Sequence, residues 1–175
     1  MLETENLAYL PSVSASASGS VTEPFYYVNG YQGTDVATAK ASANYQTYGA
    51  FYNWPASLTA CPTGWHLPSQ VEWNTLITFL GGTSSGGTMK EIGITHWNDP
   101  NVGATNSSGL TMRGAGFRWM TSNGTFENPG LRTYHWSSTE SSPNAYHLGL
   151  FSSGTTTLMD TDPKDMGFSV RCLKD

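Results

Sequence analysis

The sequence predicts one domain built largely from short strands and turns, with little helix. Aromatic residues make up 13% of the 175 positions and charged residues only 12%, about half the usual share. Nineteen glycines and nine prolines, with many serines, threonines and asparagines, favour turns between short strands. A chain of this length buries a core without added metals, and its low charge indicates a neutral, hydrogen-bonding outer surface.

The first third of the chain predicts short elements joined by loops. We expect a first strand in ENLAYL (residues 5–10) and a surface loop over residues 11–23, which contain the low-complexity stretch PSVSASASGS. A weakly helical, alanine-rich piece follows, and then a strand around Tyr48 to Tyr52. Asn53 is placed to cap a short helix through Leu58, with Pro55 in its first turn.

One helix is clearly indicated in LPSQVEWNTLITFLGG. Ser69 is the expected N-cap, and Glu72 three residues later completes a capping box. Apolar side chains then recur on one face with helical spacing, and Gly81 provides the stop. The pattern predicts a helix from about Gln70 to Leu80. Its apolar residues are Trp73, Leu76, Ile77 and Leu80.

Beyond Gly82 the sequence favours short strands separated by Gly, Ser, Thr and Asn. In AYHLGLF, the side chains of Tyr146, Leu148 and Leu150 share one face, and those of His147, Gly149 and Phe151 share the other. No internal repeat of solenoid or propeller period is present.

The charge and the hydropathy pattern exclude several functional classes. The net charge is −5, and the eight Lys and Arg residues are scattered, so nucleic-acid binding is not expected. No apolar run approaches the roughly 20 residues that cross a bilayer. MLETENLAYL is not a signal peptide, and we interpret Met1 as following a removed export signal. The expected location is therefore extracellular or at the cell surface.

Several stretches, in order, resemble a known bacterial family. They are ENLAYL, YGAFYNW, ACPTGWHLPSQVEW, WSSTE, NAY and GFSVRC, and together they span nearly the whole chain. The resemblance is to the Fibrobacter major paralogous domain family, within the formylglycine-generating-enzyme-like branch of the C-type lectin fold. It implies a single α+β domain of residues 1–175, with one or two helices on short antiparallel sheets, much ordered loop, and adjacent N- and C-terminal strands.

The implied topology brings the two cysteines of the chain together. With the terminal strand beside the early part of the domain, Cys172 can form a disulfide with Cys61, 111 positions earlier. Closing a loop of that length contributes up to roughly 4–5 kcal/mol in the chain-entropy model. Two buried free thiols are the alternative.

The resemblance also raises the question of catalysis. Formylglycine-generating enzymes use paired copper-binding cysteines before the terminal strand, but no cysteine lies between Asn144 and Met166. His66, His96, His135 and His147 lack metal-site spacing, and His66 is expected to be a packed or capping residue. There is no G-x-S-x-G motif. We therefore expect no enzyme and no cofactor.

Calcium binding of the lectin type is also weakly supported. WND (Trp97–Asp99) and ENP (Glu127–Pro129) resemble lectin signatures, but their order is reversed and WND lies far from the terminal strand. Calcium needs about 6–8 converging oxygens. We interpret both stretches as coincidence and expect no metal site.

The resemblance implies a binding face in the last third of the chain. Framework residues there (Trp136–Glu140, Asn144–Tyr146 and GFSVRC) alternate with residues that differ among family members. The latter are Trp119, Tyr134, His135, His147, Gly149, Phe151, Met159, Asp160, Asp162, Asp165 and Met166. The arrangement resembles variable proteins diversified by retroelements. The alternative is that Trp119, Phe151 and Met159 are core residues.

These observations lead to two main hypotheses. The first is a non-catalytic, exported module that recognises a protein or carbohydrate partner through this face. The second is a structural building block of the cell envelope, and an enzyme related to formylglycine-generating enzymes is a distant third. Exposure of Trp119, Tyr134 and Phe151 favours recognition, whereas their burial favours the building block.

Overall fold

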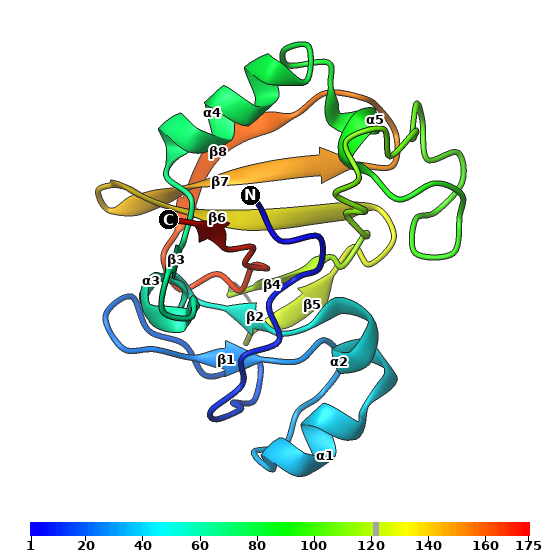
Figure 1. Cartoon of the computed structure of the whole chain (residues 1–175). Coiled ribbons are helices and arrows are strands. Elements are labelled where there is room, and N and C mark those ends of the chain that lie inside the picture. Colours follow the sequence, from blue (N-terminus) through cyan, green and yellow to red (C-terminus); the bar gives the residue numbers. More distant parts are fainter. Residues whose placement is uncertain (121–122) are drawn as a thin grey trace.

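The structure, a computed structural model, describes residues 1–120 and 123–175 (Figure 1). The helices there are α1 Val36–Ala41, α2 Ala43–Tyr48, α3 Trp54–Ala60, α4 Gln70–Phe79 and α5 Gly86–Met89. The strands are β1 Tyr26–Tyr27, β2 Phe51–Tyr52, β3 Trp65–His66, β4 Phe117–Trp119, β5 Thr125–Glu127, β6 Arg132–Ser141, β7 Asn144–Phe151, β8 Leu158–Pro163 and β9 Leu173–Lys174. The architecture is therefore mixed α and β with much loop, as predicted.

The strands form small antiparallel sheets. The largest has the order β6-β7-β8, and three two-stranded sheets pair β1 with β2, β3 with β9, and β4 with β5. Strand β6 has an irregularity in its register between Trp136 and Glu140. None of the helices in the described residues is long and apolar enough to cross a membrane.

Helix α4 begins where the sequence predicts. Ser69 caps it through the N–H of Glu72, and the Glu72 side chain accepts from the Ser69 N–H, which completes the capping box. Trp73 and Ile77 are buried on its inner face, as predicted. Helix α3 is also confirmed, with Asn53 as its N-cap and proline in its first turn.

The two ends of the chain run side by side, but the predicted strand at residues 5–10 does not form. Leu2 makes an isolated antiparallel bridge with Leu173, and the N–H of Leu7 donates to the carbonyl of Val170 at 2.9 Å. The N-terminal segment thus follows the C-terminal one with too few regular hydrogen bonds to make a strand. The strand predicted around Tyr48–Tyr52 is confined to β2, because α2 extends to Tyr48.

The disulfide predicted between Cys61 and Cys172 is present. The two Cα atoms are 5.7 Å apart and the sequence separation is 111. Cys61 follows α3, and Cys172 immediately precedes β9. The bond therefore fastens the end of the chain to the segment that leads into α4.

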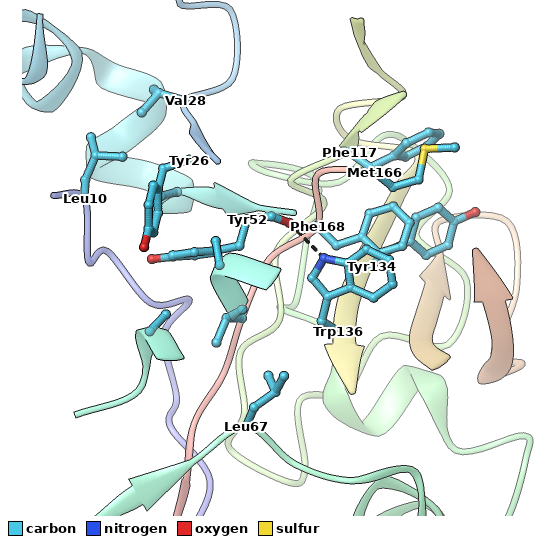
Figure 2. Packing of buried hydrophobic residues seen from close by; sticks show 14 of the residues in the cluster. Leu10, Tyr26, Val28, Tyr52, Leu67, Phe117, Tyr134, Trp136, Met166 and Phe168 are labelled. Carbon is cyan, nitrogen blue, oxygen red and sulfur yellow. Dashed lines mark hydrogen bonds between the residues drawn. The ribbon is translucent and has the colours of Figure 1, made fainter. Parts of the chain in front are cut away.

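The core is aromatic and centres on the C-terminal segment (Figure 2). Phe168 pairs with Tyr52 in an isolated bridge, and its ring centroid lies 4.3 Å from that of Trp136. Trp136 Nε1 donates to the Tyr52 carbonyl at 2.8 Å. Trp136 lies on one face of the β6-β7-β8 sheet. On the opposite face of that sheet, Leu148 and Leu150 pack in a second cluster with residues of α4. Both faces of β6 and β7 are therefore covered.

Arg118 holds part of the predicted surface loop against the core. Its buried guanidinium donates to the carbonyls of Ser16, Ser18 and Asp165, and it lies 4.3 Å from the centroid of the Tyr27 ring. Residues 11–23 contain no helix or strand, as expected, but Val13 and Ser16 are buried. The loop is thus ordered by a side chain about a hundred residues away.

Lys90 plays a similar part in another loop region. Its side chain is fully buried, and its Nζ donates to the carbonyls of Val102, Phe151 and Gly154 at 2.9, 2.8 and 3.0 Å. Nζ also lies 5.5 Å from the Trp97 ring centroid. Burial lowers the pKa of Lys90 to about 8, so the ammonium form still dominates at neutral pH.

Candidate functional site

Four residues of the predicted binding face lie inside the protein. Tyr134, His135, His147 and Met166 are at most 7% exposed, so the expectation that they project outward is wrong. Tyr134, His135 and His147 are buried because the β6–β7 sheet is covered on both faces, and Met166, which follows β8, packs in the aromatic core cluster. His147 Nε2 lies 2.9 Å from a carboxylate oxygen of Asp162, which ties one predicted residue to another.

The remaining predicted residues form no open aromatic face. Asp160 is exposed, whereas Trp119, Phe151, Met159, Asp162 and Asp165 are partly buried. The Trp119 ring packs edge-on against Phe117, with centroids 5.8 Å apart, and Phe151 packs edge-on against Tyr134 at 6.3 Å. These rings extend the core toward the surface.

The WND and ENP stretches are occupied with internal contacts. Trp97 is buried and its Nε1 donates to the Met112 carbonyl at 2.8 Å, while the Asn98 N–H donates to the Gly130 carbonyl at 2.8 Å. Thr125 Oγ1 donates to Glu127 Oε1 at 2.7 Å. Across residues 1–120 and 123–175, no group of three or more His, Cys, Asp or Glu side chains is arranged to hold a metal ion.

His66 connects the C-terminus to the start of α4. Its Nδ1 lies 2.6 Å from Asp175 Oδ1 and its Nε2 lies 3.0 Å from Glu72 Oε1. Hydrogen bonds to Asp175 first and Glu72 second raise the pKa of His66 above its usual value. His66 thus extends the capping box, in agreement with the predicted packing or capping role.

A small polar pocket lies beside the N-terminal segment and α2. Its volume is about 180 Å³, and its walls include Glu5, Asn6, Tyr48, Thr111, Arg113 and Arg171. Two guanidinium groups therefore line one hollow in a chain whose net charge is −5.

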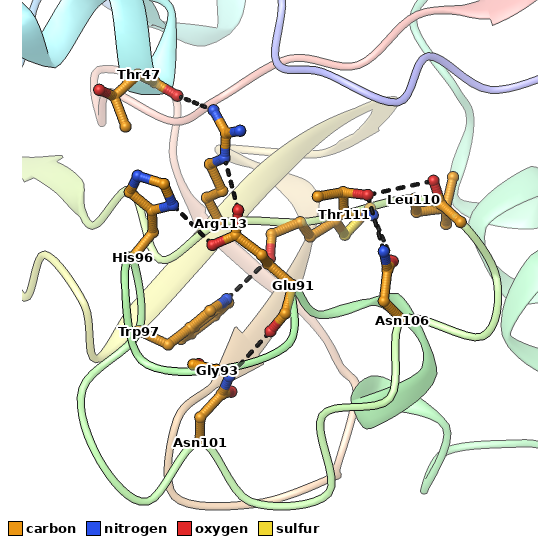
Figure 3. A network of polar contacts seen from close by, with 12 residues as sticks. Thr47, Glu91, Gly93, His96, Trp97, Asn101, Asn106, Leu110, Thr111 and Arg113 are labelled. Carbon is orange, nitrogen blue, oxygen red and sulfur yellow. Dashed lines mark hydrogen bonds and ion pairs between the residues drawn. The ribbon is translucent and has the colours of Figure 1, made fainter.

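A hydrogen-bond network fixes Arg113 at this pocket (Figure 3). Glu91 accepts from Arg113 Nε at 3.1 Å through one carboxylate oxygen and contacts His96 Nδ1 at 2.7 Å through the other. Arg113 Nη1 donates to the Thr47 carbonyl at 2.9 Å. The Tyr48 ring packs edge-on against His96, with centroids 5.8 Å apart. The network orients the arginine and leaves its side chain 30% exposed.

Arg171 is more deeply placed than Arg113. It is 1% exposed, and it donates to Asn6 Oδ1 at 3.1 Å and to the carbonyls of Glu3, Leu110 and Thr111. All four acceptors are uncharged oxygens. Burial lowers the pKa of Arg171 to about 9, although the nearby acidic side chains act in the opposite direction. The group remains a cation at neutral pH.

An apolar groove lies on the other side of the N-terminal segment. Its volume is about 940 Å³, and its lining includes Leu2, Trp65, Leu76, Phe79, Leu80 and Leu110. Phe79 is 84% exposed, and Val71, which lines a shallow hollow next to the groove with Phe79, is 70% exposed. Such side chains clustered on one helix mark a surface that another molecule can cover.

Comparison with known proteins identifies the family. A family model described as the Fibrobacter succinogenes major domain matches residues 3–174. The chain belongs to this family. Searches of curated proteins and of solved structures find no match. The matched region of this Fibrobacter major-domain chain includes both cysteines, the polar pocket and most of the apolar groove.

The sequence did not predict the polar pocket or the apolar groove of this family member as binding sites. Val71 and Phe79 lie off the α4 stripe that packs inward, so their apolar character was the available signal. Arg113 and Arg171 stand alone among apolar and small residues in TMRGAG and FSVRCL. An isolated arginine in a charge-poor stretch is a signal for a buried or functional cation, but not for its partners.

Proposed function

We propose that the chain is a non-catalytic, exported recognition module that binds a protein partner in the apolar groove. The observation that carries the proposal is the groove beside α4, where Phe79 is 84% exposed. Aliphatic and aromatic side chains gathered in a hollow favour a partner that inserts apolar side chains of its own. Carbohydrate offers few such groups, so a protein partner fits the lining better.

The charge of the groove narrows the chemistry of the partner. Its lining contains the acidic residues Glu3 and Glu5 and no lysine, arginine or histidine, in a chain of net charge −5. An acidic rim favours a basic partner through electrostatic complementarity. We therefore assign the groove to a segment of a partner protein that combines apolar anchors with lysine or arginine.

Further features support the exported and lectin-like parts of the proposal. The disulfide between Cys61 and Cys172 suits an oxidising compartment, since such bonds are rare in reducing ones. Adjacent chain ends, short antiparallel sheets and extensive ordered loops are the features that the C-type lectin-like fold implies. We propose that fold, and with it the likeness to retroelement-diversified variable proteins, although the varied surface would not include the buried Tyr134 and His147.

Selection from a phage-displayed random peptide library tests the groove. The immobilised oxidised domain should enrich peptides that carry both apolar and basic residues. Their affinity should fall about tenfold or more for Phe79→Asp, the scale of a hot-spot loss, as measured by calorimetry. Leu58→Asp is the matched control, since Leu58 is an exposed apolar residue on α3 outside the groove, and it should bind like the wild type.

Other outcomes of the same experiment decide against the proposal. Peptides that bind Phe79→Asp as well as the wild type would show that the groove is not the site. Enrichment on a glycan array, with none from the peptide library, would replace the protein partner by a carbohydrate.

A structural building block is the second candidate. The burial of Tyr134 and the partial burial of Trp119 and Phe151 favour it, because the predicted aromatic face is not open. If the folded, oxidised domain binds neither peptides nor glycans, the structural building block becomes the better-supported function.

A further inference from the structure

The polar pocket holds two cations that are unequally neutralised. Arg113 forms an ion pair with Glu91, whereas Arg171 makes no ion pair among the described residues and bonds only to uncharged oxygens. Glu5, the acidic residue of the pocket wall, forms no ion pair with either arginine in that part of the chain. Glu3 and Glu5 lie close enough to interact with the charge of Arg171, but neither forms an ion pair with it, so Arg171 is a cation at the base of the pocket without a direct counterion in the described chain.

Arg113, which lines the pocket, also has a donor nitrogen without an internal partner among the described residues. Its internal bonds use Nε, toward Glu91, and Nη1, toward Thr47. No bond from Nη2 is found within the described chain, and Figure 3 draws this nitrogen without a partner. Because Glu91 and Thr47 fix the plane of the guanidinium, the remaining donor is held in position before any ligand binds, which lowers the cost of ordering on binding.

We propose that this pocket binds a carboxylate group, with Arg113 as the direct donor and Arg171 as a buried second charge. Planar guanidinium and carboxylate groups match in geometry and form strong charge-assisted hydrogen bonds. A volume of about 180 Å³ accommodates a terminal acidic group and not a whole drug-sized ligand. Glu5 on the wall disfavours a doubly charged phosphate or sulfate relative to a singly charged carboxylate.

The carboxylate can belong to an acidic sugar or to an amino acid, because the pocket recognises the carboxylate group that both ligands contain. Titrations of the isotope-labelled oxidised domain by NMR would use glucuronate and N-acetylglycine, with glucose and N-acetylglycinamide as neutral matched probes. Both acids should cause saturable shifts at Thr47 and at the Arg113 side chain. A tenfold preference for one acid would identify the source as a sugar or a peptide, and equal affinity would assign binding to the carboxylate alone.

Two substitutions give opposite expectations. Arg113→Gln should weaken binding about tenfold or more, since a hydrogen bond to a charged group is lost. Glu5→Gln should strengthen binding, because it removes the like charge from the pocket wall and leaves both arginines in place. Arg132→Gln is the control, as Arg132 is exposed and outside the pocket, and it should leave affinity unchanged.

Several results would overturn the proposal. These are the absence of saturable shifts with either acid, equal shifts from the neutral probes, or unchanged affinity in both Arg113→Gln and Glu5→Gln. The pocket site does not depend on the groove function, and Phe79→Asp alters the groove without touching the pocket lining. Loss of one type of binding with retention of the other therefore separates the two proposals.

Discussion

Substitution of Lys90 by methionine tests how this domain orders its loops. Methionine keeps the length and most of the apolar volume of the side chain and removes only the ammonium group. The carbonyls of Val102, Phe151 and Gly154 then each lose a donor. A buried acceptor left without a partner costs about 1–3 kcal/mol, which gives about 3–9 kcal/mol for the three.

Relief from burying a charge offsets part of this cost. We therefore expect Lys90→Met to lower the free energy of unfolding by about 3 kcal/mol, at the lower end of the range. For a domain of this size, that change lowers Tm by about 6–12 °C.

Chemical denaturation of the oxidised protein at neutral pH, followed by tryptophan fluorescence and circular dichroism, measures the change. Lys40→Met is the control, because Lys40 is exposed at the end of α1 and its loss should change stability by about 0.5 kcal/mol or less. A stability for Lys90→Met within about 1 kcal/mol of the wild type, or above it, would refute the reasoning, since the ammonium would then be dispensable.

Three further perturbations follow from the same structure. Replacing Cys61 and Cys172 by alanine should cost up to about 4.8 kcal/mol, from closure of the 111-residue loop, and native-state labelling of both thiols in the wild type would contradict this. Arg118→Met should speed amide hydrogen exchange in residues 11–20, because their carbonyl anchors are lost, and unchanged exchange there would count against the anchor. The raised pKa of His66 contributes stability that is complete below its usual value of 6.5 and is lost as the pH rises through the folded value. The Tm difference between the wild type and His66→Gln should therefore shrink from mildly acidic to alkaline pH, and a difference independent of pH would exclude this linkage.

Local signals predicted the parts of the fold that local chemistry decides. The capping box of Ser69 and Glu72 marks the start of α4, and Asn53 marks that of α3, because a cap involves residues only three positions apart. The closing disulfide came from the family resemblance. Strand β2 lies within the strand predicted around Tyr48 to Tyr52, but β1, β3 and β9 have two residues each, too few to show any alternation, so the sequence could not locate them.

The candidate site was harder to predict, since burial depends on neighbours distant in sequence. Alternation in AYHLGLF separates two faces of a strand but does not tell whether one or both are covered. Here the segment around Phe168 covers the face that carries His147 and Tyr134. The same limit applies to Arg171, because three of its four acceptors are main-chain carbonyls, which leave no mark in the sequence.

Buried cations explain how a chain with few long elements keeps its loops ordered. Three of the eight lysines and arginines (Lys90, Arg118 and Arg171) are at most 1% exposed, and each donates to at least three main-chain carbonyls. Every residue type has a carbonyl, so the side chains of the anchored loops can change while the anchor persists. A framework that fixes the loop backbone and leaves its side chains free is what a recognition module requires, whereas a building block with one invariant contact surface gains nothing from that freedom.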